Sequence, residues 1–258
     1  MLFPKAERVV YDHNPLVEVI CQFKYPPILR INSEEPVSFQ EKIADEFPIL
    51  TETVGVIPDG VVQTLPSEAI RAIKGASKAY EFSTRDKHWV VSLTREFIAL
   101  TNSNYIRWEE FYSKFKIPFY ALNEVYSPQF FSRIGLRYQN VIHRSQLGLT
   151  DMKWTELINP VLTHFFEVVD DESQIEEAIY TTVLDIGDGT KVRIRYGKVR
   201  ETNSNETCFL IDNDFYTNEE KDFTDGLAVI TDFNERNRDL FRWCLTDTLH
   251  NAMDPRPV

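Results

Sequence analysis

Residues 131–143 read FSRIGLRYQNVIH, and this segment decides the fold class. Its residues Ile134, Leu136 and Tyr138 occupy every second position, with Gly135 and Arg137 between them. Such alternation is typical of a β-strand with one buried face. The segment lies between two stretches of helical pattern, so the chain mixes strands and helices.

Similar patterns extend in both directions from this strand. Apolar residues at alternating positions predict further strands at 16–23, 53–57, 70–73, 79–83, 88–100, 178–186, 192–196 and 207–215. Apolar residues every three or four positions predict helices at 38–47, 104–126, 154–169 and 225–253, with a kink or restart at Pro118. Consecutive strands without intervening helices favour antiparallel pairing. We therefore expect an α+β fold, in which long helices pack on the faces of antiparallel sheets.

The predicted elements fall into two groups of similar content. Residues 1–147 form an N-terminal α+β half, and residues 148–258 form an acidic C-terminal α+β half that ends in a long helix. Each half combines several strands with a long helix. No exact sequence repeat supports a duplication, so two similar halves remain an open alternative.

Composition excludes several classes of protein. The chain has 258 residues with 43% hydrophobic and 26% charged side chains, which is typical of a folded globular domain. It has no apolar stretch long enough to span a membrane, and its first residues lack a secretory signal pattern, so we expect a cytoplasmic protein. Its three cysteines share no CxxC spacing, which argues against a disulfide framework or a zinc ribbon.

The net charge of −12 is distributed unevenly. Residues 1–150 hold 17 basic and 17 acidic side chains, whereas residues 151–258 hold 11 and 23. Nucleic-acid binding is therefore not expected, since it normally requires a basic patch. The acidic half suits a partner protein with a basic surface; the alternative is a surface that only confers solubility.

Several motifs together resemble a known family. They are NPLVEV at 14–19, YxxWEEF at 105–111, RIGLRYQN at 133–140, LIDND at 210–214 and FxxxLTDxL at 241–249. In order and spacing the chain resembles a sporadically distributed prokaryotic family of conserved hypothetical proteins. One departure is NERN at 234–237, where the family pattern has a Leu-His pair. The resemblance implies a shared fold and no reaction, and its patchy distribution resembles that of defence-associated genes.

Two carboxylates are the strongest enzymatic lead. Asp212 and Asp214 are two positions apart on a predicted strand, so both side chains would share one face and could bind a divalent cation. They do not fit an EF-hand loop, because its glycine and glutamate positions hold Thr217 and Phe223. The alternative is a solvated strand face.

Two pairs of arginines are candidates for binding an anion. Arg133 and Arg137 lie on either side of Gly135, where the missing side chain would allow close approach of a ligand. The alternative for Arg137 is an internal ion pair with a carboxylate such as Glu18. Arg193 and Arg195 also share a strand face and could bind phosphate or balance the surrounding acids.

These observations lead to one main hypothesis and two alternatives. The main hypothesis is a non-catalytic binding protein without a cofactor that recognises another protein through a sheet edge or its acidic half, in a defence or toxin-neutralising system. One alternative is a metal-dependent phosphoester hydrolase using Asp212 and Asp214, and the other is a sensor of a small anion using Arg133 and Arg137. No catalytic residue is assigned, and self-association into a homo-oligomer stays open.

Overall fold

The computed structural model describes residues 2–54, 78–169, 171–201 and 206–258. Its strands are β1 Val9–Tyr11, β2 Leu16–Lys24, β3 Ile49–Val54, β4 Lys78–Ser83, β5 Trp89–Leu93, β6 Phe97–Asn102, β7 Arg133–Ile142, β8 Ala178–Gly187, β9 Thr190–Arg200, β10 Thr207–Thr217 and β11 Pro255–Pro257. Its α-helices are α1 Arg30–Ser33, α2 Val37–Ile43, α5 Trp108–Tyr126, α6 Trp154–Leu157, α7 Pro160–Thr163, α8 Phe223–Cys244 and α9 Asp247–Ala252. Short 3-10 helices are η1 Ser145–Leu147, η2 His164–Val168 and η3 Glu172–Gln174.

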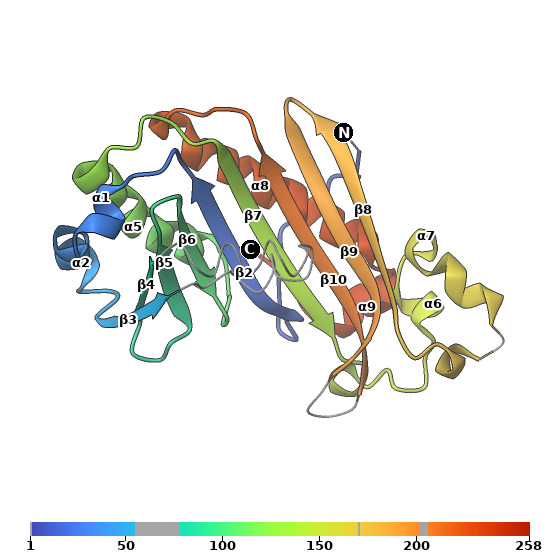
Figure 1. Cartoon of the computed structure of the whole chain (residues 1–258). Coiled ribbons are helices and arrows are strands. Elements are labelled where there is room, and N and C mark those ends of the chain that lie inside the picture. The colour runs from blue at the N-terminus through green and yellow to red at the C-terminus, as the bar shows by residue number, and fades with distance from the viewer. Residues whose placement is uncertain (1, 55–77, 170, 202–205) are drawn as a thin grey trace.

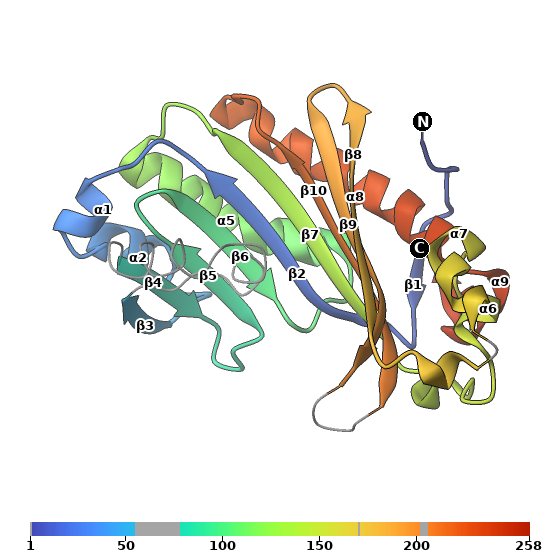
Figure 2. The ribbon, with the colours of Figure 1, turned by 45° about the vertical axis from the view of Figure 1, so that its right-hand side comes forward.

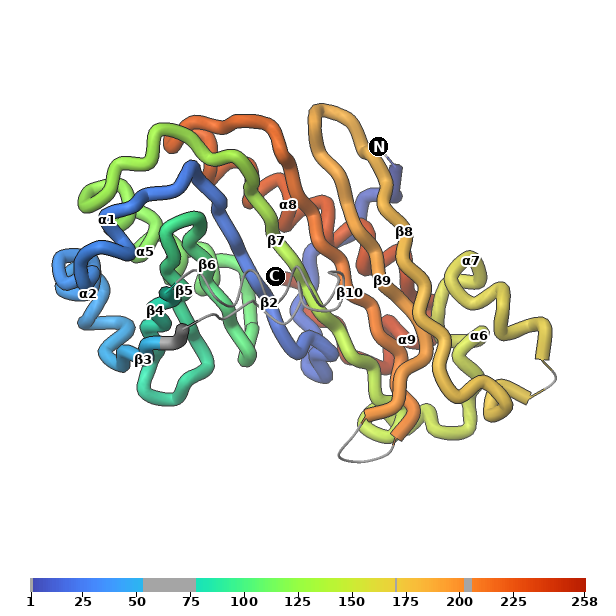
Figure 3. Tube along the Cα trace, viewed as in Figure 1, coloured from blue at the N-terminus to red at the C-terminus, as the bar shows by residue number. Residues whose placement is uncertain are grey.

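Nine of the described strands form a single antiparallel sheet (Figure 1), whose path along the Cα trace can be followed in Figure 3. Their order across the sheet is β3-β4-β5-β6-β2-β7-β10-β9-β8. The fold is therefore α+β, as the sequence predicts. The proposed boundary at residue 147 falls between strands of this one sheet, because β7 pairs with both β2 and β10.

The two halves of the sheet have the same topology. Outward from its centre, one half runs β2, β6, β5, β4 and the other runs β7, β10, β9, β8. Each innermost strand comes first along the chain, is followed by short helices and then by a three-strand meander, and a long helix ends the unit. By this correspondence β8 matches β4. The first half has one additional strand, β3, which pairs with the outer edge of β4.

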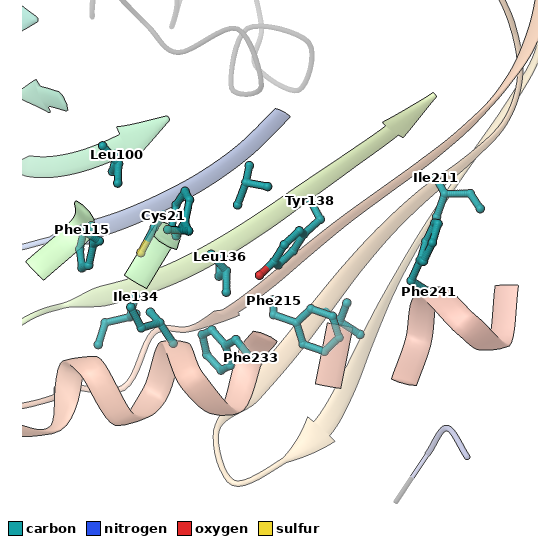
Figure 4. Packing of buried hydrophobic residues seen from close by; sticks show 14 of the residues in the cluster. Cys21, Leu100, Phe115, Ile134, Leu136, Tyr138, Ile211, Phe215, Phe233 and Phe241 are labelled. Carbon is teal, nitrogen blue, oxygen red and sulfur yellow. The ribbon is translucent and has the colours of Figure 1, made fainter. Parts of the chain in front are cut away.

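Both long helices, α5 and α8, lie on the same face of the sheet (Figures 1 and 2). The core fills the space between them and the strands. Figure 4 shows Phe115 of α5 and Phe233 of α8 on the side of the sheet from which Leu136 projects. These three side chains are almost completely buried. Burial of each such side chain contributes about 1.5–3 kcal/mol, so this layer holds the helices on the sheet.

The strand expected at 88–100 is instead a hairpin. Strands β5 and β6 pair with each other, and the chain reverses between them at Thr94. The Thr94 hydroxyl accepts hydrogen bonds from the backbone amides of Glu96 and Phe97, both at 3.1 Å. This threonine turn contains no Gly, Pro or Asn, which is why the turn signals of the sequence do not reveal it.

Two predicted long helices are interrupted. The helix expected at 154–169 is divided into α6, α7 and η2. A new helix, α7, begins at Pro160, and the Asn159 side chain caps it by accepting a hydrogen bond from the Val161 amide. The helix expected at 225–253 is divided into α8 and α9 at Thr246, whose hydroxyl accepts a hydrogen bond from the Leu249 amide. In contrast, α5 continues through Pro118.

Two of the predicted strands lie wholly or partly beyond the described residues. The strand expected at 70–73 lies entirely outside them, and only the first two residues of the one expected at 53–57 fall within β3. No described helix is long and apolar enough to cross a membrane.

The two ends of the described chain meet. Strand β1 pairs with β11 in a separate two-stranded sheet, with Val10 opposite Arg256. Residues 2–11 form an extended N-terminal arm. Asp239 of α8 holds this arm, because its carboxylate accepts a hydrogen bond from the Ala6 amide at 3.0 Å and forms an ion pair with Lys5 at 3.2 Å. Figure 2 shows β1 beside α8 and α9, away from the central strands.

Candidate binding edge and the charged face of the sheet

All six candidate site residues converge on the face of the sheet opposite α5 and α8. The strand register places Arg137 and Arg193 directly opposite Asp214, from the two sides of β10. Asp212 lies opposite Arg195. The sequence treats these residues as three separate pairs, whereas the structure joins them into one cluster, called here the sheet-face cluster.

Each carboxylate of the sheet-face cluster is held by arginines. Arg137 donates from Nε and Nη2 to the two oxygens of Asp212, both at 2.7 Å, while Arg195 Nη1 lies 3.6 Å from that carboxylate. Asp214 accepts from Arg133 at 3.0 Å and lies 3.8 Å from Arg193. Bidentate pairing of this kind is strong and fixes both partners in place.

The pairing alters the acidity of the buried groups. Burial lowers the pKa of Arg137, but its hydrogen bond with Asp212 and the charge of that carboxylate outweigh burial, so the pKa is raised overall. Glu18 adds to this rise, and Asp212 accepts the two hydrogen bonds of Arg137 described above. Burial raises the pKa of Asp214, and nearby arginine charges oppose the rise without cancelling it.

The open space at Gly135 is filled by the protein itself. A methyl group added there would meet Arg133 Nη1 at 2.4 Å, so the guanidinium lies directly over the glycine backbone. The same guanidinium lies 5.0 Å from the centre of the Tyr216 ring, and Arg133 Nη1 donates to Gln22 at 3.3 Å. Gly135 thus permits an internal contact of Arg133.

This geometry bears on the metal and anion alternatives. A divalent cation at Asp212 would have to displace the guanidinium of Arg137 from both carboxylate oxygens, at the cost of a buried ion pair. Within the described ranges, no three His, Cys, Asp or Glu side chains are grouped to hold a metal ion. The cluster has four guanidinium groups for two carboxylates, so it keeps a positive charge. The arrangement favours internal ion pairing over a metal centre.

A second feature of this region is the edge strand β8. It has ten residues and pairs with β9 along nearly its whole length, and no strand of the described residues pairs with its outer edge. Ile179 and Val183 are exposed on it, Val183 to 49%. Natural edge strands commonly carry Lys or Pro, which prevents pairing with another chain. β8 carries neither.

The sequence around β8 is strongly acidic. Residues 154–190 contain nine Asp and Glu and no Lys or Arg. Among them, Glu176 and Glu177 precede β8, Asp185 lies within it and Asp188 lies in the turn after it, and all four are exposed. These four exposed carboxylates give β8 and its two ends a negative charge.

Exposed apolar side chains lie beside the same strand. Phe165 of η2 and Tyr180 of β8 have ring centres 6.4 Å apart, which places this part of the chain next to the beginning of the strand. Val161, Phe165 and Val168 are all exposed. We call β8 together with these three residues the β8 edge. The sequence predicted binding at a sheet edge but did not identify β8 as the edge strand. The absence of basic residues from 154–190 could have indicated this region.

Comparison with known proteins adds no assignment. No family model matches the chain, and no curated protein matches it.

Proposed function

We propose that this chain is a non-catalytic binding protein that accepts an extended segment of a partner protein as an additional strand on β8. One observation carries the proposal. In the first half of the sheet the outer edge of β4 is covered by β3, whereas its counterpart β8 has no such strand among the described residues. A partner strand at that position would complete the correspondence between the halves. Main-chain hydrogen bonds would supply affinity, and side-chain contacts would supply specificity.

The chemistry of the β8 edge defines the partner. Its segment would carry Lys or Arg to face Glu177 and Asp185, and apolar residues to cover Ile179 and Val183. At about 3.3 Å per residue, ten residues of β8 offer about 33 Å of edge. A second copy of this chain fits less well, since pairing two β8 strands would bring two acidic segments together. The resemblance to a patchily distributed family supports the further proposal that this binding serves a defence or toxin-neutralising system.

The experiment compares two lysine variants at equally exposed valines. Val183→Lys adds a positive charge to the β8 edge, and Val37→Lys makes the same change at the start of α2, where the side chain is also 49% exposed. The tagged wild-type chain is purified from its native host, and a stoichiometric partner is identified, expressed and titrated against all three proteins. We expect Val183→Lys to weaken binding at least about tenfold, while Val37→Lys binds as the wild type does.

Two further measurements locate the contact. Binding should weaken as salt is raised, because exposed charges are screened. Hydrogen exchange should slow at the β8 amides when the partner is bound. Protection confined to other strands, or wild-type affinity of Val183→Lys, would refute the proposal. A dimer of the chain alone with protected β8 amides would replace the partner with a second copy.

A further inference from the structure

A cavity lies between the N-terminal arm, strand β7 and helix α8, on the helix-covered side of the sheet. Its volume is about 130 Å³. An apolar cavity of about 150 Å³ can hold benzene, so this one has room for a ligand of nearly that size. The cavity is distinct from the β8 edge and the sheet-face cluster, since none of their residues lines it. We call it the arm cavity.

Arginine predominates among the charged residues that line the arm cavity. Four arginines line it (Arg8, Arg107, Arg238 and Arg242), and the only acidic residue among the lining residues is Glu7. In a chain with net charge −12, such a concentration is local and does not reflect the overall surface. Low-dielectric walls strengthen the attraction of these charges for an anion.

Two of the four arginines are already engaged. Arg8 pairs with Glu109, and Arg242 pairs with Asp247 and donates to the Leu245 carbonyl at 3.2 Å. In contrast, within the described part of the chain no hydrogen bond or close ion pair holds the guanidinium of Arg107, although its charge contributes to lowering the pKa of Glu109.

Arg238 is incompletely paired. Its Nε is buried and makes no hydrogen bond. The nearest carboxylate, Asp239, lies 3.7 Å away and already binds Lys5 and the Ala6 amide of the arm. A buried donor without an acceptor costs about 1–3 kcal/mol, more when it is charged. Arg238 lines the arm cavity with a side chain that is 28% exposed, so the remaining N–H groups of its guanidinium are the ones an anion there would reach.

Buried amides provide further donors in the arm cavity. Asn237 is 7% exposed, and its Oδ1 accepts from Asn213 at 3.2 Å. Among the described residues, its amide nitrogen has no acceptor. Tyr138 directs its hydroxyl towards α8, where it donates to Asn234 at 2.8 Å (Figure 4). Asn234, Asn237 and Arg238 are thus held in the lining by helix α8, whereas Arg107 comes from the turn before α5.

We propose that the arm cavity binds a small anion carrying a phosphate or carboxylate group, with Arg238 and Arg107 as the charged contacts and Asn237 as a neutral donor. Guanidinium groups bind both kinds of anion through paired N–H donors. Because residues 7–11 of the arm form one wall, we expect a bound anion to stabilise this part of the arm against α8.

The test uses two probes, inorganic phosphate and malonate, with chloride at the same ionic strength as the reference. Calorimetric titration of the wild-type chain should give a dissociation constant near or below about 1 mM for at least one probe. The probe that binds more tightly distinguishes a phosphate ligand from a carboxylate ligand. Arg238→Gln and Arg107→Gln should each weaken binding at least about tenfold.

A matched control lies on the same helix. Arg236 pairs with Asp232 and has a similar side-chain exposure, 30% against 28% for Arg238, but it does not line the arm cavity. Arg236→Gln should bind the probe as the wild type does, and melting curves of all variants confirm that they are folded. The bound probe should also slow tryptic cleavage after Lys5 and Arg8. Absence of binding by both probes, or equal losses in Arg236→Gln and Arg238→Gln, would overturn the proposal.

Discussion

Replacement of Arg137 by Ala tests the central ion pair of the sheet-face cluster. The substitution removes both hydrogen bonds to Asp212, whose side chain is only 3% exposed. Breaking a buried ion pair from one side typically costs 3–5 kcal/mol, because the remaining charge is left uncompensated. Here Arg195 stays 3.6 Å from the carboxylate, and Arg137 itself is 16% exposed. We therefore expect the lower end, a loss of about 3 kcal/mol in the free energy of unfolding.

The assay is urea unfolding followed by circular dichroism, with melting temperature as a second readout. A loss of about 3 kcal/mol should lower the melting temperature by about 6 °C or more in a chain of this size. Arg193→Ala is the control, because Arg193 lies 3.8 Å from Asp214, is more exposed and should contribute less than about 1 kcal/mol.

A double-mutant cycle identifies the partner of Arg137. Combining Arg137→Met with Asp212→Asn leaves neither charge of the pair behind, so the double variant should lose about 1–2 kcal/mol less than the two single losses together. If Arg137→Ala cost no more than Arg193→Ala, or if the cycle showed no coupling, the assignment of a structural ion pair would be wrong.

Two other sites give independent tests. Gly135→Ala should push the Arg133 guanidinium away and lower the free energy of unfolding by about 1 kcal/mol. In an Arg133→Ala background the same change should be nearly neutral. Equal losses in urea unfolding of both backgrounds would refute this contact. Burial, assisted by Arg242, lowers the pKa of His250 below its ordinary value of 6.5, so the unfolded chain binds a proton more readily than the folded chain. Stability from neutral His250 should therefore be complete above about pH 6.5 and fall as the pH drops below it, and melting curves between about pH 7.5 and 5.5 should show a smaller decrease for His250→Gln than for the wild type.

Much of the fold follows from the sequence because many strands have one buried and one polar face. The alternation in β2 and β7 and the helical spacing in α5 locate these elements to within a few residues. The turn between β5 and β6 and the break between α8 and α9 were not predicted. Both depend on side-chain hydroxyls that accept hydrogen bonds from backbone amides. The Thr94 hydroxyl forms the β5–β6 turn, and the Thr246 hydroxyl begins α9. Threonine occurs in many other settings, so its presence alone does not indicate a turn.

The candidate site was predicted in pieces. An internal ion pair of Arg137 was predicted only as an alternative to anion binding, with Glu18 as the example, and the choice of Asp212 depends on the register of β7 against β10. That register is set by contacts between segments far apart in the chain and cannot be read from either strand alone. The arm cavity was not predicted at all, because its arginines come from three separate segments: the arm, the turn before α5, and α8.

The pairing of β1 with β11 has a consequence for the order of events during synthesis. Strand β1 is translated before all nine strands of the large sheet, but its partner, Pro255–Pro257, is translated after all of them. While the nine-stranded sheet forms, β1 has no strand to pair with. The wall that it gives to the arm cavity must therefore be added in a late step, after α8 is complete. A nascent chain halted before residue 255 would keep the β8 edge and Asp239 but leave Val9–Tyr11 without a partner strand.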